Sequence, residues 1–233
     1  MSAAVVDTDD LWVFAYGSLM WQPGFAPAES VQALLHGYHR ALCVYSVRYR
    51  GSSERPGLVF GLDLGGACEG MAMKIAPGDR EHVLKYLRDR EQVTGIYRAQ
   101  TRQVLLRDGS HRRVRALCFV AERWHPQRVE GLSLKDRARV VLASRGIAGR
   151  NIDYVLSTLR HLRELDIHDD LLERLVTLTG CHRHLRIPEG VPANGAVRTG
   201  RLTGTQLAYP FGHTPRLPPG RVLRCNHRRN LGY

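Results

Sequence analysis

The stretch Leu11-Trp12-Val13-Phe14-Ala15-Tyr16-Gly17-Ser18 determines how the rest of the chain can fold. Its run of apolar and aromatic residues ends at Gly-Ser, which predicts a short buried strand that leads into a turn. Such a strand needs partners in a sheet. Residues 31–46 supply them, because β-branched and aromatic residues surround Gly37 and predict two strands or one bent strand.

Further strands are predicted downstream. Residues 58–62 and 70–75 are expected to form a strand pair that is connected through Gly65-Gly66. Residues 97–106 and 114–121 are expected to form a hairpin, because an Asp-Gly turn separates them. The first half of the chain therefore predicts a β-rich domain.

Helices are predicted mainly in the second half. One helix, capped by Asp79 and ending near Arg90-Glu91, lies among the strands. Three more are expected to begin near residues 133, 151 and 169–170. Because strands come first and helices later, the order predicts an α+β fold rather than a doubly wound α/β sheet.

The positive charge of the chain is concentrated at its C-terminal end. The chain has 233 residues and a formal net charge of +12, and residues 181–233 contain nine Arg, no Lys and one Glu. The same segment is rich in Pro and Gly and has no helical or alternating pattern. We therefore expect a folded domain over residues 1–180 and a basic, largely irregular tail over residues 181–233.

The composition also excludes several classes of protein. A hydrophobic content of 43% excludes a wholly disordered chain, and no apolar run reaches the ~18 residues of a membrane span. The first residues lack the basic start of a secretory signal. Five separated cysteines predict reduced thiols and a cytoplasmic location. Cys181-His182-Arg183-His184 and Cys225-Asn226-His227 fit no familiar zinc spacing, so no metal site is expected.

Two places could carry chemistry. After the first strand, the backbone N–H groups of Tyr16-Gly17-Ser18-Leu19 could hold an anion, although a plain turn has the same sequence features. Glu91, at the end of the embedded helix, could face a cavity and act as a base. A solvated glutamate in a charge run is the alternative for Glu91.

Several segments together resemble the ChaC-type γ-glutamylcyclotransferases, the glutathione-specific branch of the γ-glutamylcyclotransferase-like fold. The resemblance spans about residues 12–176. The segments that carry it are Val13 to Phe25, Tyr45-Ser46, Arg50-Gly51-Ser52, Pro56-Gly57, Gly70-Met71-Ala72, Tyr86-Leu87 with Arg90-Glu91, and Gly146 to Leu156.

The resemblance implies a fold and an activity. The fold would be a mixed, barrel-like sheet with one embedded helix and C-terminal helices packed on it. The activity would be cleavage of glutathione to 5-oxoproline and Cys-Gly by a lyase that needs neither cofactor nor metal. Glu91 would be the general acid/base, and Tyr16, Gly17, Ser18, Leu19, Tyr97 and Arg48 would contact the substrate.

The chain differs from the common family pattern at two places that are expected to shape the substrate cleft. The loop over residues 47–56 is shorter than in the common pattern. Between Glu91 and Tyr97 the chain has two residues more than that pattern. Other γ-glutamyl amino acids or amines are therefore the alternative substrates. An inactive fold with a nucleic-acid-binding basic tail is an alternative of another class, although nucleic acid is an unlikely partner because the tail has few aromatic residues.

Overall fold

The computed structural model describes residues 10–91 and 94–181. Its strands are β1 (Leu11–Ala15), β2 (Glu29–Ser46), β3 (Gly57–Ile75), β4 (Tyr97–Leu106), β5 (Arg113–Ala121), β6 (Arg145–Gly146) and β7 (Gly149–Arg150). Its helices are α1 (Arg80–Glu91), α2 (Leu134–Ala143), α3 (Asn151–Glu164) and α4 (Asp170–Leu178), with 3₁₀ turns η1 (Ser18–Met20) and η2 (Pro77–Asp79). The order of elements confirms the α+β prediction.

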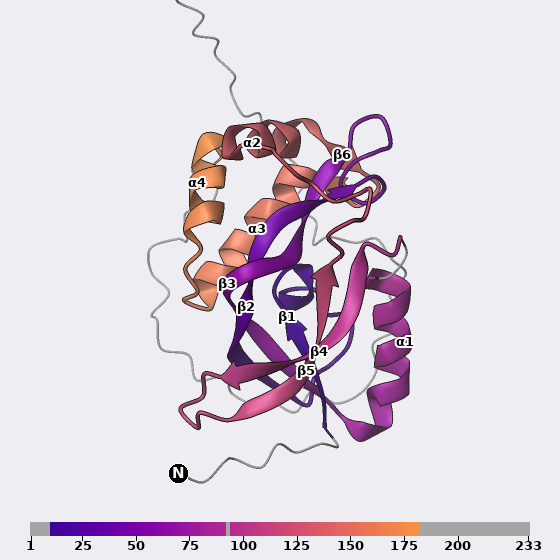
Figure 1. The fold of residues 1–233 in the computed structure, drawn as a ribbon, viewed down its shortest axis with the longest axis vertical. Coiled ribbons are helices and arrows are strands. Elements are labelled where there is room, and N and C mark those ends of the chain that lie inside the picture. The colour runs from indigo at the N-terminus through magenta and orange to yellow at the C-terminus, as the bar shows by residue number, and fades with distance from the viewer. Residues whose placement is uncertain (1–9, 92–93, 182–233) are drawn as a thin grey trace, which may run out of the picture.

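The sheet closes into a barrel in the order β1-β3-β2-β4-β5, with a further pairing between β3 and β5. β1 pairs antiparallel with β3 and parallel with β5, so the first strand lies at the seam. Residues 12–16 are all buried, which confirms the buried strand predicted there. In Figure 1, α1 lies beside the barrel, while α2, α3 and α4 gather around the far end of the long β2–β3 ribbon.

The predicted strand pair over residues 58–62 and 70–75 is wrong. Both segments belong to the single strand β3, which pairs with β2 along nearly its whole length. Gly65 and Gly66 have positive φ angles of 94° and 70°, but they lie opposite Gly37 at a register shift between β2 and β3. A bulge bends a ribbon instead of reversing it. The glycines therefore curve both strands into the barrel.

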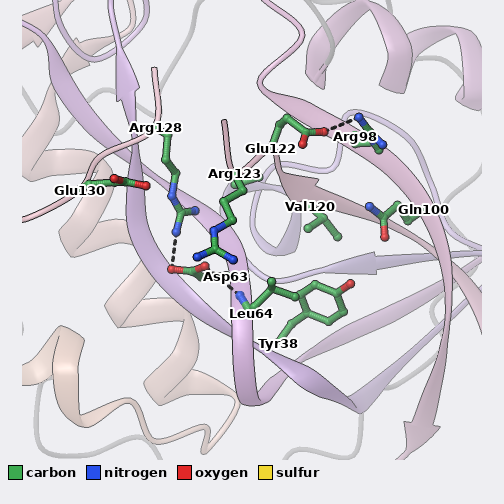
Figure 2. A pocket seen from close by; sticks show the side chains of 11 residues that line it. Tyr38, Asp63, Leu64, Arg98, Gln100, Val120, Glu122, Arg123, Arg128 and Glu130 are labelled. Carbon is green, nitrogen blue, oxygen red and sulfur yellow. Dashed lines mark hydrogen bonds and ion pairs between the residues drawn. The ribbon is translucent and has the colours of Figure 1, made fainter. Parts of the chain in front are cut away.

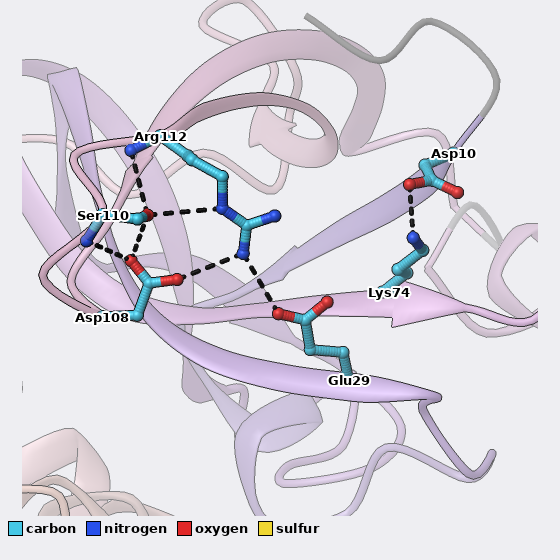
Figure 3. A network of polar contacts seen from close by, with 6 residues as sticks. All are labelled: Asp10, Glu29, Lys74, Asp108, Ser110 and Arg112. Carbon is cyan, nitrogen blue, oxygen red and sulfur yellow. Dashed lines mark hydrogen bonds and ion pairs between the residues drawn. The ribbon is translucent and has the colours of Figure 1, made fainter. Parts of the chain in front are cut away.

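The β4–β5 hairpin forms around the predicted Asp-Gly turn, and Gly109 has a φ of 81°. Figure 3 shows how polar contacts hold this turn. Asp108 accepts a hydrogen bond from the backbone N–H of Ser110 (2.9 Å) and pairs with Arg112 (3.1 Å). The hydrogen bonds from Ser110, and then the Arg112 charge, lower the pKa of Asp108 to about 2. Arg112 also pairs with Glu29, which ties the turn to the start of β2.

Two of the three C-terminal helices, α2 and α4, begin at side-chain caps. Ser133 accepts a hydrogen bond from the N–H of Asp136 (3.2 Å), and Asp169 accepts one from the N–H of Leu172 (3.0 Å). Cys181 follows α4 and is 1% exposed within the main core. The rest of the predicted tail lies outside the described residues. No helix in residues 10–91 or 94–181 combines the length and apolar character needed to cross a membrane.

Candidate active site

Glu91 is the last residue of α1, and the helix directs its side chain inward. Val83 and Leu87 are buried on the face that α1 presents to the barrel. Glu91 follows Leu87 by four residues, so it continues the same face. Its side chain is 16% exposed. Burial raises the pKa of Glu91, and the neighbouring Arg90 opposes this rise.

Arg90 connects Glu91 to the loop after β1. Its Nε lies 3.1 Å from Oε1 of Glu91, and its Nη2 donates a hydrogen bond to Oγ of Ser18 (3.0 Å). Its Nη1 donates to the carbonyl oxygen of Gln22 (2.7 Å). Sequence reasoning did not include Arg90 among the site residues, although its place beside Glu91 was a usable signal.

The loop residues Tyr16, Gly17, Ser18 and Leu19 divide into two kinds. Tyr16 and Leu19 are each 6% exposed, and the Tyr16 hydroxyl donates to the carbonyl of Phe119 (2.7 Å). These two side chains therefore pack in the core. Gly17 and Ser18 form the turn itself, where η1 begins. The first N–H groups of a helix have no partner within it, so this turn presents donors.

Two further tyrosines surround Phe60 of β3. The Tyr97 hydroxyl donates to the Phe60 carbonyl (2.5 Å), and the Tyr154 hydroxyl accepts from the Phe60 N–H (3.1 Å). A Cβ on Gly17 would lie 3.6 Å from the Tyr154 hydroxyl, which places α3 against the loop. Sequence reasoning included Tyr97 but missed the role of Tyr154, because only the fold brings α3 to β3.

Glu91 and the three tyrosines near the loop after β1, Tyr16, Tyr97 and Tyr154, are here called the Glu91 cluster. Burial raises the pKa values of Tyr16, Tyr97 and Tyr154, and the charge of Glu91 raises each of them further. The hydroxyls therefore stay protonated at neutral pH and can donate hydrogen bonds. The cluster combines one buried carboxylate with neutral hydroxyls and backbone donors.

Arg48 and Arg50 occupy very different environments. Arg48 is exposed; its guanidinium lies 5.7 Å from the ring centre of Tyr49, and its carbonyl accepts from the N–H of Ile147 (3.0 Å). Arg50 is 7% exposed, and its guanidinium lies 5.3 Å from the ring centre of Tyr154. The described contacts thus bring Arg50, and not Arg48, to the tyrosine cluster. A role for Arg48 toward the substrate stays a prediction.

A separate cavity of about 420 Å³ is lined by Asp63 and Leu64 of β3 together with residues of β2, β4 and β5. Figure 2 shows that ion pairs occupy its wall: Arg128 with Asp63 (2.5 Å) and Arg98 with Glu122 (2.7 Å). The lining does not include Glu91 or the loop after β1.

The described residues contain no group of three or more His, Cys, Asp or Glu side chains placed to hold a metal ion. Of the cysteine and histidine residues considered for zinc, Cys181 is buried in the core. The others lie outside the described residues.

Comparisons with known proteins assign the family. The family model for ChaC-like proteins matches residues 11–181. The chain belongs to the ChaC-like family. The matched region contains every element of this ChaC-like protein from β1 to α4, and therefore the whole Glu91 cluster.

Curated relatives extend this assignment. The ChaC-like protein is 33% identical over 185 residues to the glutathione-specific γ-glutamylcyclotransferase of Escherichia coli (strain K12), covering 79% of each chain. It is 34% identical over 152 residues to glutathione-specific γ-glutamylcyclotransferase 1 of Homo sapiens, covering 64% of this chain and 68% of the human protein.

A solved structure shares the fold. A glutathione-specific γ-glutamyl cyclotransferase from yeast superposes with a TM-score of 0.68 at 20% identity, and the match covers 76% of this chain and 98% of the yeast chain. At this identity the likeness supports the fold alone. It confirms the expected γ-glutamylcyclotransferase-like architecture for this ChaC-like protein.

Proposed function

We propose that this ChaC-like protein is a γ-glutamylcyclotransferase that converts glutathione to 5-oxoproline and Cys-Gly. One observation carries the proposal: within the family-matched region, Arg90 connects Glu91, whose side chain is largely buried, to Ser18 of the loop after β1. The activity is the one that the names of the curated relatives state. A cytoplasmic location is part of the same proposal.

The reaction needs little chemistry from the protein. The α-amine nitrogen of the γ-glutamyl group attacks its own γ-carbonyl carbon, and a five-membered lactam forms. The bond between that carbon and the cysteine nitrogen breaks. A proton leaves the attacking nitrogen and reaches the departing nitrogen, so no oxidant, metal or enzyme nucleophile is consumed. The protein must hold the substrate folded and move this proton.

Glu91 is the proposed carrier of that proton. A carboxylate with an ordinary pKa is a weak base, and burial raises the pKa of Glu91 toward the range where proton transfer is efficient. Arg90 holds the carboxylate through its Nε at 3.1 Å. Glu91 would take the proton from the substrate amine and return it to the leaving nitrogen.

The Tyr16-Gly17-Ser18-Leu19 loop is the proposed anion cradle. The turn at Gly17 and Ser18 offers backbone N–H groups to the α-carboxylate or to the oxyanion that develops on the γ-carbonyl. Gly17 lies close to Tyr154, since a Cβ at this position would be 3.6 Å from the Tyr154 hydroxyl. Tyr97 would line the substrate site next to the loop. Arg48 would contact the substrate from the surface.

The direct test compares wild type with Glu91→Gln, which keeps the side-chain shape and removes the base. Wild type should release 5-oxoproline and Cys-Gly from glutathione in equal amounts. Turnover by Glu91→Gln should fall by about 10²- to 10⁴-fold. Glu81→Gln is the matched control, because Glu81 lies exposed on the same helix. A Glu91→Gln variant that keeps more than about a third of wild-type turnover contradicts the assignment.

Substrate range is tested with γ-glutamyl-alanine alongside glutathione. A glutathione-specific enzyme should turn over glutathione with a much higher kcat/KM, because contacts to Cys-Gly contribute to transition-state binding. Equal values for the two substrates would instead support the broader γ-glutamyl specificity.

A further inference from the structure

Two arginines of the described chain are less than a tenth exposed, and only one of them has a counter-charge. Arg40 (8% exposed) pairs with Asp169 at 2.8 Å and donates to the carbonyls of Tyr16 and Glu69. Arg50 (7% exposed) has one side-chain hydrogen bond, from Nη1 to the carbonyl of Ala148 (2.5 Å). No carboxylate of the described residues lies within ion-pair distance of Arg50.

An unpaired buried cation is unfavourable, because the charged form loses its hydration. Burial accordingly lowers the pKa of Arg50, and Asp153 and Tyr154 offset this only in part. Asp153 is itself engaged by Arg150 (2.6 Å) and is 44% exposed. Among the described residues, the charge of Arg50 therefore has a carbonyl and an aromatic ring as neighbours but no ion-pair partner.

The position of Arg50 shows which anion could complete it. Its guanidinium lies over the ring of Tyr154, and the Tyr154 hydroxyl would be 3.6 Å from a Cβ at Gly17, in the loop after β1. Arg50 and Glu91 both act on the pKa of Tyr154, Arg50 lowering it and Glu91 raising it. Arg50 thus lies on the Tyr154 side of the same cluster whose other side holds the proposed base.

We propose that Arg50 binds a carboxylate of the substrate. This inference rests on the proposed function, since glutathione brings two carboxylates: the α-carboxylate of its γ-glutamyl group and the carboxylate of its glycine. A guanidinium presents a planar fork of N–H donors that matches a carboxylate. In Arg50, Nη1 already donates one hydrogen bond to the carbonyl of Ala148. Binding would neutralise the buried charge and hold the substrate beside Glu91.

The first experiment measures kcat and KM for glutathione in wild type, Arg50→Gln, Arg50→Lys and Arg160→Gln. Arg160 is exposed on α3, the helix that carries Tyr154, and serves as the matched control. Arg50→Gln should lower kcat/KM by about 10- to 100-fold, mainly through KM, because a charged hydrogen bond to the substrate is lost. Arg50→Lys should recover part of this loss, and Arg160→Gln should match wild type.

The second experiment separates binding from a structural effect, because Arg50 also holds the Ala148 carbonyl. Two altered substrates are compared with glutathione: its glycyl monoethyl ester, and 4-aminobutanoyl-Cys-Gly, which lacks the α-carboxylate. The second is followed as 2-pyrrolidinone release or as inhibition of glutathione turnover. With one of the two altered substrates, wild type and Arg50→Gln should have nearly equal kcat/KM values or inhibition constants. The carboxylate that is missing or esterified in that substrate is then the one that Arg50 binds.

An unchanged difference with both altered substrates overturns the inference, because a structural defect lowers activity on all substrates alike. If Arg50→Gln fails to fold, the same comparison is made with Arg50→Lys. Wild type that releases no 5-oxoproline from glutathione would refute the proposed function itself. If wild type is active and Arg50→Gln loses activity by the same factor on all substrates, only the role of Arg50 is refuted.

Discussion

Glu91 and Arg90 are adjacent residues, and the charge of Arg90 opposes the effect of burial on the pKa of Glu91. Burial raises the pKa of Glu91 above its ordinary value of 4.5, and Arg90 restrains the rise. A base works only when deprotonated, so kcat/KM should decline as pH falls through the pKa of Glu91. Because that pKa is raised, the decline should begin at a higher pH than an exposed glutamate would give.

This pairing predicts the behaviour of Arg90→Gln. Without the neighbouring cation, the carboxylate is harder to ionise, so the acidic limb of the kcat/KM profile should move to higher pH. Arg88→Gln is the control, since Arg88 is exposed on the same turn of α1. An acidic limb that stays in place in Arg90→Gln would show that Arg90 does not tune the base.

Gly17 offers a test of the loop. An added Cβ would meet Phe60 and the Tyr154 hydroxyl at 3.6 Å, an ordinary contact distance, so Gly17→Ala has room for its methyl group. The thermal midpoint of unfolding checks that the variant folds. The methyl group would occupy the space in front of the loop, so KM for glutathione should rise. Unchanged KM and kcat would place the substrate elsewhere.

The junction of α3 with β3 depends on Asn151, the first residue of α3. Its side chain is fully buried, accepts a hydrogen bond from the N–H of Leu58 (2.6 Å) and donates to the Leu58 carbonyl (2.7 Å). Leu58 lies in β3 two residues before Phe60. One amide thus fixes the helix that carries Tyr154 against the strand that Tyr154 contacts.

Asn151→Ala should lower the free energy of unfolding by about 2–5 kcal/mol, because two buried backbone groups lose their partner. Urea unfolding provides the measurement. Asp153→Ala is the control on the same helix; its ion pair with Arg150 is exposed and should contribute less than about 1 kcal/mol. Equal losses in the two variants would contradict the role given to Asn151.

The domain of residues 10–181 and the basic segment after it can be separated by experiment. Cys181 is buried in the core, and the family match ends at the same residue. The nine arginines counted in the C-terminal segment all follow Cys181. We expect a chain ending at residue 181 to match the full chain in kcat/KM and in unfolding midpoint.

Nucleic-acid binding is measured on the same two chains at low and high salt. Phosphate contacts from arginine weaken steeply with salt. Binding by the full chain that disappears on truncation would assign that property to the basic segment. Loss of glutathione turnover on truncation would instead contradict the independence of the catalytic domain.

Local pattern was sufficient for most elements. Periodicity and turn chemistry located β1, the β4–β5 hairpin and the starts of the C-terminal helices, because those features depend on neighbours in sequence. Prediction from local pattern failed at Gly65-Gly66, because two glycines are compatible with either a turn or a bulge. Only pairing with β2, opposite Gly37, selects the bulge.

The order of elements, the family resemblance and the choice of Glu91 as the candidate base follow from the amino-acid sequence, since these lie in contiguous motifs. The tertiary structure was needed to show that Arg90 connects Glu91 to the loop after β1, that Arg50 lies over Tyr154, and that β3 is one strand. These contacts join segments as far apart as the loop after β1 and α3. Their formation depends on barrel closure and packing, which no local pattern encodes.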